Sequence, residues 1–444
     1  MKLRKIFTVG AAVALAASLA ACGDDNGNGA GPAETPTETE APPVDPVDPV
    51  DPVDPVDPVD PVDPSAIDCG DEDVTLVVWE SLGAEGDFVV QAGEAFSAVC
   101  PNITINYVNV ELGDTATNMA LDGPAGTGAD VFVGPHDVLG ALVEQGLIYP
   151  VANEAALRAN VLGSFVNALT LDGTTWGYPI AGETWTMVYN RDLVDTPPRT
   201  WDELISFIET FNEENPGMFG LAYDVGNFYY NSMWMTMDGN RLFGPYGTNA
   251  SDPEVNTPAS VAGFTYFQSL RPLMRGVASG DLDTGAVDGL FMAGQSAIHL
   301  TGPWNVANFD EAGLNWGVAT MFSLPGQTTP ALTFAGTRTM FVSAFSEHQD
   351  AAHAFALFMT TPEMQQLRVD ITGALPTSTA DIAMDHPAMA GFAAQMEFAF
   401  VMPSIPAMGA VWDALNTATG NIWDGADPQS ELDAATAVIL DAAG

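Results

Sequence analysis

The chain has 444 residues and contains 58 Asp and Glu against 11 Lys and Arg, which gives a formal net charge of −47 at pH 7. Hydrophobic residues make up 47% of it, so length and composition predict about two or three folded domains. The acidity excludes a nucleic-acid partner and a basic membrane-surface patch, because both need clustered Lys and Arg. No lysine follows Lys5, and this acid-rich, lysine-free composition is typical of adaptation to high salt. A GC-rich genome that favours Arg and Ala is the alternative explanation.

The first 21 residues have the pattern of a secretion signal. Three basic residues precede an apolar stretch from Ile6 to Ala17, which is too short for a comfortable membrane span. The segment ends in Leu19-Ala20-Ala21-Cys22, which resembles a bacterial lipobox. The resemblance implies cleavage of residues 1–21 as a signal peptide, lipidation of the Cys22 thiol, and anchoring to the outer side of the cell membrane by lipid alone. An ordinary secretory cleavage beside an unrelated cysteine is the alternative.

Residues 22–68 predict an extended, acidic linker. They contain 13 acidic residues, no Lys or Arg, and seven consecutive Val-Asp-Pro repeats from Val44 to Pro64. Proline at every third position favours the polyproline II helix, so the repeats should form a stiff spacer of about 65 Å at about 3.1 Å per residue. Such a segment cannot build a core. We expect it to hold the folded region away from the membrane.

The first predicted folded unit contains two cysteines. With Cys22 assigned to lipid, Cys69 and Cys100 are an even pair in an exported domain, which favours a disulfide over two free thiols. A strand, a helix and a second strand are predicted in turn at Val74–Trp79, Phe88–Val99 and Ile103–Val108. In such a unit the helix returns to the end at which the first strand began. This path would bring Cys100 close to Cys69.

Apolar strands and helical stretches continue to alternate up to the C-terminus, as expected for α/β domains. Further strands are predicted at Val131–Val133, Thr186–Tyr189 and Ala297–Leu300. Further helices are predicted at Trp201–Asn212, Ala351–Met359 and Pro362–Asp370. The glycine-rich segment Gly123–Gly128 lacks the Lys-Ser/Thr of a phosphate loop and is expected to be a loop between elements. His348 and His353 are five residues apart, which is the wrong spacing for two ligands on one helix face, so neither a metal site nor a cofactor is predicted.

Short motifs in the same order resemble the sugar class of extracellular solute-binding proteins, most closely the maltose/maltodextrin-binding proteins. The motifs are Val77–Trp79, Ala129–Asp137, Tyr178–Glu183, Tyr189–Leu193, Pro197–Trp201, Gly302–Trp304, Met402–Met408 and Trp412. Each is weak alone, but together they are collinear over nearly all of residues 70–444.

The resemblance implies a two-lobed α/β fold of the periplasmic-binding-protein (Venus-flytrap) type. Each lobe would be a mainly parallel sheet flanked by helices, and crossover hinge segments would join the lobes around a ligand cleft. Lobe 1 would hold residues 69–181 and 337–381, and lobe 2 residues 186–333 and 388–444. The protein would be a monomer that closes on its ligand and presents it to the permease subunits of an ABC importer.

A sugar site needs flat aromatic surfaces for the C–H faces of the ring, and carboxylates or amides for its hydroxyls. Carried over position by position, the resemblance implies hydroxyl binding by Asp137 and Glu183, a polar contact from Asn227, and stacking on Tyr229, Trp304 and Trp412. Glu80, Trp185 and Tyr230 are added as neighbouring candidates. Asp137 has helix capping as an alternative role. For Glu183, burial in a crossover without a partner would be costly, which favours a ligand contact.

The expected function is therefore capture of a maltose- or maltodextrin-like oligosaccharide by a protein that is not an enzyme. Departures from the family pattern leave trehalose, sucrose or another α-glucoside as alternatives: the loop Glu80–Glu85 has no lysine, Val138 follows the predicted carboxylate, and Asn416 stands where an arginine contact can occur. The acidity suggests a cationic small solute as another alternative. The enzyme alternative is a glycosidase that uses Asp137 and Glu183 as its carboxylate pair.

Overall fold

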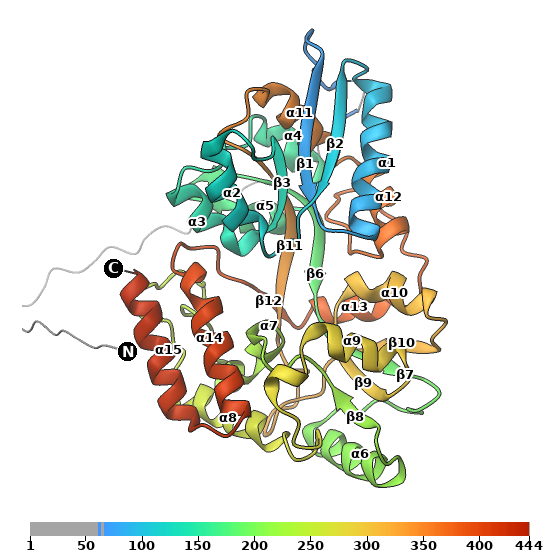
Figure 1. Ribbon diagram of the computed structural model, residues 1–444, viewed down its shortest axis with the longest axis vertical. Coiled ribbons are helices and arrows are strands. Elements are labelled where there is room, and N and C mark those ends of the chain that lie inside the picture. The colour runs from blue at the N-terminus through green and yellow to red at the C-terminus, as the bar shows by residue number, and fades with distance from the viewer. Residues whose placement is uncertain (1–60, 64–65, 444) are drawn as a thin grey trace, which may run out of the picture. The chain divides into compact units, whose positions relative to one another are not determined.

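The computed structural model of the chain describes residues 61–63 and 66–443 (Figure 1). The predicted signal peptide, the lipidation site Cys22 and most of the predicted linker lie outside the described residues. Within the described part of the chain, no helix combines the length and the apolar character needed to cross a membrane.

A six-stranded mixed sheet carries the N-terminal part of the fold. Its strands are β1 (Val74–Glu80), β2 (Ile103–Asn109), β3 (Val131–Pro135), β6 (Tyr178–Thr184), β11 (Thr333–Val342) and β12 (Ala399–Val401). The order is β12-β11-β3-β1-β2, and β6 also pairs with β11. Strand β1 is parallel to β2 and β3, whereas β11 is antiparallel to β3 and β6 and parallel to β12. The β-branched run of β1 accounts for its burial, with Leu76 and Val78 fully buried.

Helices pack around this sheet, with α1 and α12 side by side in Figure 1. The helices are α1 (Ala84–Val99), α2 (Thr115–Ala125), α3 (Leu139–Glu144), α4 (Glu154–Asn160), α5 (Gly163–Ala168), α11 (Gln349–Phe358) and α12 (Pro362–Thr372), and the 3-10 turn η2 spans His136–Val138. A two-stranded sheet joins β4 (Thr170–Leu171) to β5 (Thr174–Thr175). Helix α1 buries Phe88, Ala92 and Phe96 at four-residue spacing, so one face packs on the core. The Phe96 ring lies 5.2 Å from that of Phe355 on α11.

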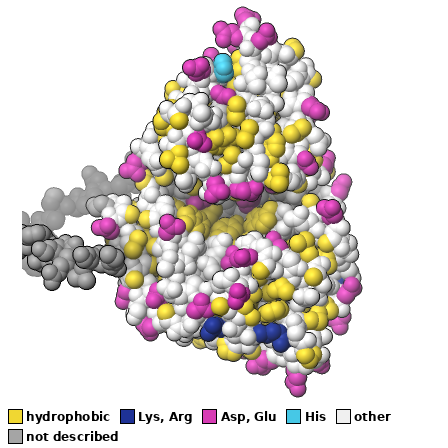
Figure 2. Space-filling model, in the orientation of Figure 1, with side chains coloured by type: hydrophobic (Ala, Val, Ile, Leu, Met, Phe, Trp, Pro, Cys, Tyr) yellow, Lys and Arg dark blue, Asp and Glu magenta, His cyan; other side chains and the backbone are white. Residues whose placement is uncertain are grey.

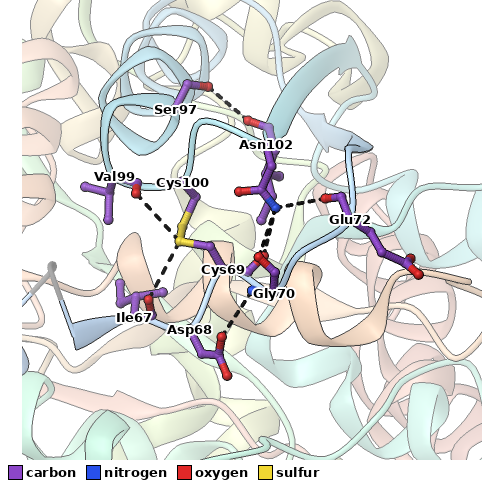
Figure 3. The surroundings of a disulfide bond; sticks show 10 residues. Ile67, Asp68, Cys69, Gly70, Glu72, Ser97, Val99, Cys100 and Asn102 are labelled. Carbon is purple, nitrogen blue, oxygen red and sulfur yellow. Dashed lines mark hydrogen bonds between the residues drawn. A yellow bond between two sulfur atoms is a disulfide. The ribbon is translucent and has the colours of Figure 1, made fainter.

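A disulfide joins Cys69, just before β1, to Cys100, just after α1 (Figure 3). Beside it, the Asn102 side chain donates hydrogen bonds to the backbone oxygens of Cys69, Gly70 and Glu72. The bridge spans 31 residues, and closing a loop of that length removes about 3 to 4 kcal/mol of unfolded-state entropy in the chain-entropy treatment. It fixes the chain just before β1 to the end of α1.

A second, four-stranded sheet has the order β10-β7-β9-β8. Its strands are β7 (Thr186–Asn190), β8 (Phe219–Ala222), β9 (Ser296–Thr301) and β10 (Trp316–Ala319). Only β8 and β9 are parallel, whereas β7 runs antiparallel to both β9 and β10. The pairing therefore differs from the mainly parallel sheet predicted for each lobe. Strand β7 follows β6 of the first sheet after the single residue Trp185 and lies between β9 and β10, so both of its pairings are antiparallel.

The helices around the second sheet cap and pack in regular ways. They are α6 (Trp201–Glu214), α7 (Phe228–Asn231), α8 (Pro258–Ser269), α9 (Thr284–Met292), α10 (Val306–Glu311), α13 (Met389–Met396), α14 (Met408–Trp423) and α15 (Pro428–Ala443). Further 3-10 turns are η3 (Ser232–Gly239), η4 (Ser279–Asp281) and η5 (Pro303–Asn305). The side chains of Thr200, Thr257 and Asp283 accept hydrogen bonds from backbone N–H groups in the first turns of α6, α8 and α9.

Each strand and helix predicted by range from the sequence has a counterpart in the structure. The glycine-rich segment Gly123–Gly128 is only partly a loop, because α2 continues through Pro124 to Ala125 and is capped by Gly126, which has φ 73°. The loop prediction was therefore wrong for its first three residues. Glycine fits here because it is tolerated inside the helix and also supplies the left-handed residue that ends it.

Two strands carry the chain between the sheets. Strand β6 ends at Thr184, and β7 begins at Thr186 in the second sheet. Strand β11 pairs with β3 over residues 338–342 and with β12 over residues 333–335. Figure 2 shows a hollow at the level of these crossing strands, with hydrophobic side chains at its floor and acidic side chains at its edges.

Candidate ligand-binding site

The predicted site residues lie on the elements that surround the crossing strands. Glu80 is the last residue of β1 and Asp137 follows β3, so both stand at the carboxyl ends of adjacent parallel strands, where α/β sheets bind ligands. Glu183 lies near the end of β6. The other candidates come from the second sheet's side: Asn227, Tyr229 and Tyr230 at α7, Trp304 in η5, Trp412 on α14, and Trp185 between β6 and β7.

Tyr229 is the centre of a group of rings that we call the aromatic cluster. The cluster consists of Trp185, Phe228, Tyr229, Tyr230, Trp304, Phe334 and Trp412. The Tyr229 ring lies 6.2 Å from that of Trp304 and 6.2 Å from that of Phe334, where it is stacked. Tyr229, Trp304 and Trp412 are half-buried, whereas Trp185 and Tyr230 are 0% and 5% exposed. The first three therefore offer ring surface to a ligand.

Local hydrogen bonds set the position of these rings. The Asn227 side chain accepts from the backbone N–H of Tyr229 and so caps α7. The Asn416 side-chain oxygen on α14 accepts from the N–H of Phe228 at 2.8 Å. A Cβ at Gly302 would collide with the Trp304 ring, so glycine permits this ring to lie over its own chain.

Asp137 is 3% exposed and has only one of its two oxygens satisfied. Its Oδ2 accepts a hydrogen bond from the Trp412 indole N–H at 2.8 Å, whereas Oδ1 has no hydrogen-bond partner among the described residues. Burial raises the pKa of the Asp137 carboxyl, and His136 and the indole N–H oppose this only in part. The capping alternative was wrong, because no side chain caps α3, whose N-cap is Val138.

His136 is fully buried beside this carboxylate and was not singled out from the sequence. Its Nε2 lies 2.9 Å from the Met402 carbonyl, and its Nδ1 accepts from the Thr337 N–H at 3.3 Å. These contacts correspond to a neutral ring that carries its proton on Nε2. Burial lowers the pKa of His136, against the opposing pull of Asp137.

Five charged side chains form a second group, which we call the ion cluster. It consists of Glu80 on β1, Glu85 on α1, Glu183 on β6, Arg338 on β11 and Arg368 on α12. Arg338 lies 2.6 Å from Glu80, 3.5 Å from Glu183 and 3.8 Å from Glu85. Arg368 pairs with Glu85 and also lies 4.0 Å from Glu80.

The carboxylates of this cluster differ in their environment. Burial alone would raise the pKa of Glu80, but Arg338 and Arg368 outweigh it and the pKa lies below its usual value. Burial raises the pKa of Glu183, and the more distant Arg338 offsets this only in part. The Glu80 side chain is 0% exposed and that of Glu183 is 13% exposed, so within the cluster Glu183 is the more accessible acceptor.

The structure thus brings the sequence candidates together but divides them by exposure. Glu183 has a buried partner in Arg338, so its burial in the crossover does not by itself require a ligand contact. Besides His136, sequence reasoning missed Glu85, Phe228, Phe334, Arg338 and Arg368. One signal was available for Arg338. It is the single charged residue in the otherwise apolar and neutral segment Thr333–Val342, and an arginine buried in such a strand needs carboxylate partners.

Comparisons with known proteins identify the family of the chain. The family model of the bacterial extracellular solute-binding proteins matches residues 91–397. A maltotriose-binding protein from Pyrococcus abyssi is 28% identical over 371 residues, covering 80% of this chain and 78% of its own. A maltooligosaccharide ABC transporter solute-binding lipoprotein from Streptococcus pneumoniae is 28% identical over 306 residues, covering 66% of this chain and 71% of its own.

A solved structure shares the fold. The crystal structure of a cyclo/maltodextrin-binding protein complexed with maltotetraose matches with a TM-score of 0.70 and 30% identity, covering 84% of this chain and 97% of that one. The predicted two-lobed α/β fold is thereby confirmed. Because the family model matches more than half of this chain, the chain belongs to the bacterial extracellular solute-binding protein family.

Proposed function

We propose that the chain captures a maltodextrin-like oligosaccharide as the substrate-binding component of an ABC importer. The observation that carries the proposal is the grouping of half-buried rings with carboxylates. The Trp412 indole donates a hydrogen bond to Asp137, the charges of Glu183 and Asp137 act to raise the pKa of Tyr229, and the Trp304 ring lies 6.2 Å from that of Tyr229. Rings of this kind stack on the C–H faces of a sugar, and carboxylates accept hydrogen bonds from its hydroxyls. The printed names of the relatives support an α-glucan as the ligand.

Exposure assigns different roles to the nine candidate residues. Glu183, Tyr229, Trp304 and Trp412 make direct contact with the sugar, and Asp137 uses the oxygen that has no partner in the described structure. Asn227 holds α7 in place through its cap. Glu80, Trp185 and Tyr230 are buried supports, because at most 5% of each is exposed. Glu80 differs from the similarly buried Asp137 in that two arginines, Arg338 and Arg368, neutralise its charge.

The lobes follow the sequence prediction in this proposal, with lobe 1 at 69–181 and 337–381 and lobe 2 at 186–333 and 388–444. Strands β6 and β11 cross from one to the other. Rotation about them would close the lobes on the ligand, as in hinge closure of binding proteins.

The location and partners of the protein are part of the same proposal. A lipid on Cys22 anchors the monomer to the outer side of the cell membrane, the linker lets it reach the permease subunits, and the sugar passes to them. The relative named as an ABC transporter solute-binding lipoprotein supports this arrangement. Membership in a solute-binding family favours capture over hydrolysis of the sugar.

Calorimetric titration with a panel of ligands tests the function. The panel is maltose, maltotriose, maltotetraose, trehalose, sucrose and spermidine, each at low and at molar salt because the chain is so acidic. We expect heat of binding from the maltooligosaccharides and none from spermidine. Binding of spermidine alone would support the cationic-solute alternative, and the absence of binding to every sugar at every salt concentration would contradict the proposal.

A further inference from the structure

Arg338 is the hub of the ion cluster. Its guanidinium group faces the three carboxylates Glu80, Glu85 and Glu183, and it also donates to the Ser81 hydroxyl at 3.0 Å. The Arg338 side chain is 6% exposed, less than the 13% of the Glu183 side chain. Among the described residues, Arg338 provides the one hydrogen bond to the Glu183 carboxylate.

The charges around Glu183 come from five elements. The carboxylates Glu80 on β1 and Glu85 on α1 repel its negative charge. The same charge helps to raise the pKa of the Tyr229 hydroxyl on α7. Arg338 on β11 and Arg368 on α12 attract it, and Arg338 has the larger effect. The cluster contains three carboxylates and two guanidinium groups, so loss of the Arg338 charge would leave three carboxylates with a single cation.

An unbalanced buried carboxylate takes up a proton rather than remain charged. Burial already raises the pKa of Glu183 above its ordinary value, and the Glu183 side chain is more exposed than that of Glu80. Protonation would remove the negative charge of the Glu183 carboxylate, and this charge is what makes its hydrogen bonds with sugar hydroxyls strong.

We propose that Arg338 is a positioning residue that keeps Glu183 ionised and aimed at the aromatic cluster, so that its carboxylate accepts ligand hydroxyls. The inference rests on the proposed function and deepens it. It assigns to a buried arginine, which does not touch the sugar, control over the pH range in which the sugar binds.

The test is the pH profile of maltotriose affinity, measured by calorimetry from about pH 8 to about pH 5, the range in which perturbed carboxyl groups titrate. Four variants are compared with the unmodified chain: Arg338→Gln, Arg338→Lys, Glu183→Gln and the double variant Arg338→Gln/Glu183→Gln. Arg158→Gln is the charge-matched control, because it removes an arginine from an exposed pair with Glu154.

We expect Glu183→Gln to bind about tenfold to hundredfold more weakly at neutral pH, the usual worth of a charged hydrogen bond. Its pH dependence should become smaller, because Asp137 is then the remaining ligand carboxylate with a raised pKa. As the pH falls, the affinity of Arg338→Gln should drop to the Glu183→Gln level at a higher pH than does that of the unmodified chain. Arg338→Lys should restore part of the pH range over which the sugar binds tightly. The double variant should match Glu183→Gln, and Arg158→Gln should match the unmodified chain.

The following outcomes would overturn the inference. One is an Arg338→Gln profile with the unmodified midpoint, or one that is weaker by the same factor at every pH. Another is an additive loss in the double variant. If Arg338→Gln does not fold, Glu183→Gln decides, because an undiminished pH dependence in that variant contradicts the role of Glu183. Absence of any sugar binding by the unmodified chain contradicts the proposed function instead, so the two failures are distinguishable.

Discussion

The two halves of the candidate site are built in opposite ways. The aromatic cluster presents ring faces from the second sheet's side, and its members are held by packing and by backbone caps such as that of Asn227. The ion cluster presents one carboxylate from the first sheet's side, and its members are held by each other's charge. The aromatic half should therefore set how tightly a sugar binds, whereas the charged half should set under which conditions it binds.

Removal of Arg368 should have the largest effect of all and should act on stability. Arg368→Met would leave Glu85 buried without its main partner, although the cation–π contact with Phe88 would be replaced by apolar packing. Breaking a buried pair on one side costs about 3 to 5 kcal/mol. Denaturant unfolding measures this, and Arg158→Met, in an exposed pair, should change stability by less than about 1 kcal/mol. Equal stability of the two variants would show that the ion cluster does not hold the fold.

Replacement of Trp412 should have the largest effect on affinity, because its ring is part of the aromatic cluster and its indole N–H holds the Asp137 carboxylate. Trp412→Ala removes a ring face and the hydrogen bond to Asp137, so we expect a loss of about 2 to 4 kcal/mol in maltotriose binding, in the range of interface hot spots. Trp412→Phe keeps a ring and should lose only about 0.5 to 1.5 kcal/mol. Calorimetry measures both, and equal losses would mean that the ring face contributes nothing.

A smaller effect separates contact rings from supporting rings. Trp304→Phe reduces a half-buried stacking surface and should weaken binding by about 1 kcal/mol. Trp185→Phe changes a fully buried ring whose indole N–H has no hydrogen-bond partner among the described residues, so affinity should hardly change. A reversed order in the two binding titrations would contradict the division by exposure.

The smallest effect concerns pH and His136. Its folded-state pKa lies below the ordinary value of 6.5, so the unfolded chain binds the proton more readily. The stability that this contributes is complete above pH 6.5 and is lost as the pH falls through the folded-state pKa. His136→Asn should therefore lose less stability than the unmodified chain on acidification below pH 6.5, as measured by thermal unfolding. His348→Asn, at the start of α11, is the matched control, and a parallel decline in all three proteins would contradict the prediction.

These differences also explain what the sequence allowed us to predict. The strands could be predicted because a run of apolar, β-branched residues such as that of β1 favours a strand by itself, whatever the rest of the chain does. Trp304 and Trp412 were readable because each lies in a short motif. The hydrogen bond between Trp412 and Asp137 was not, because 275 residues separate them and only the packing of α14 on η2 brings them together.

The ion cluster was out of reach for the same reason. Arg338 contacts Glu80 across 258 residues and Glu183 across 155, and no local pattern encodes which carboxylate a buried arginine will meet. The missing lysine in the loop Glu80–Glu85 was visible in the sequence. The arginines that pair with Glu80 and Glu85 come from β11 and α12, and only the fold shows it.

The crystal structure of the chain with bound maltotriose tests the central claim most directly, namely that one sugar meets both clusters at once. The account predicts a glucose ring stacked on Trp304 or Trp412, with hydroxyls within about 3.2 Å of the Glu183 and Asp137 carboxylates. A sugar bound elsewhere, or one that touches the aromatic cluster while Glu183 contacts only Arg338, would contradict it.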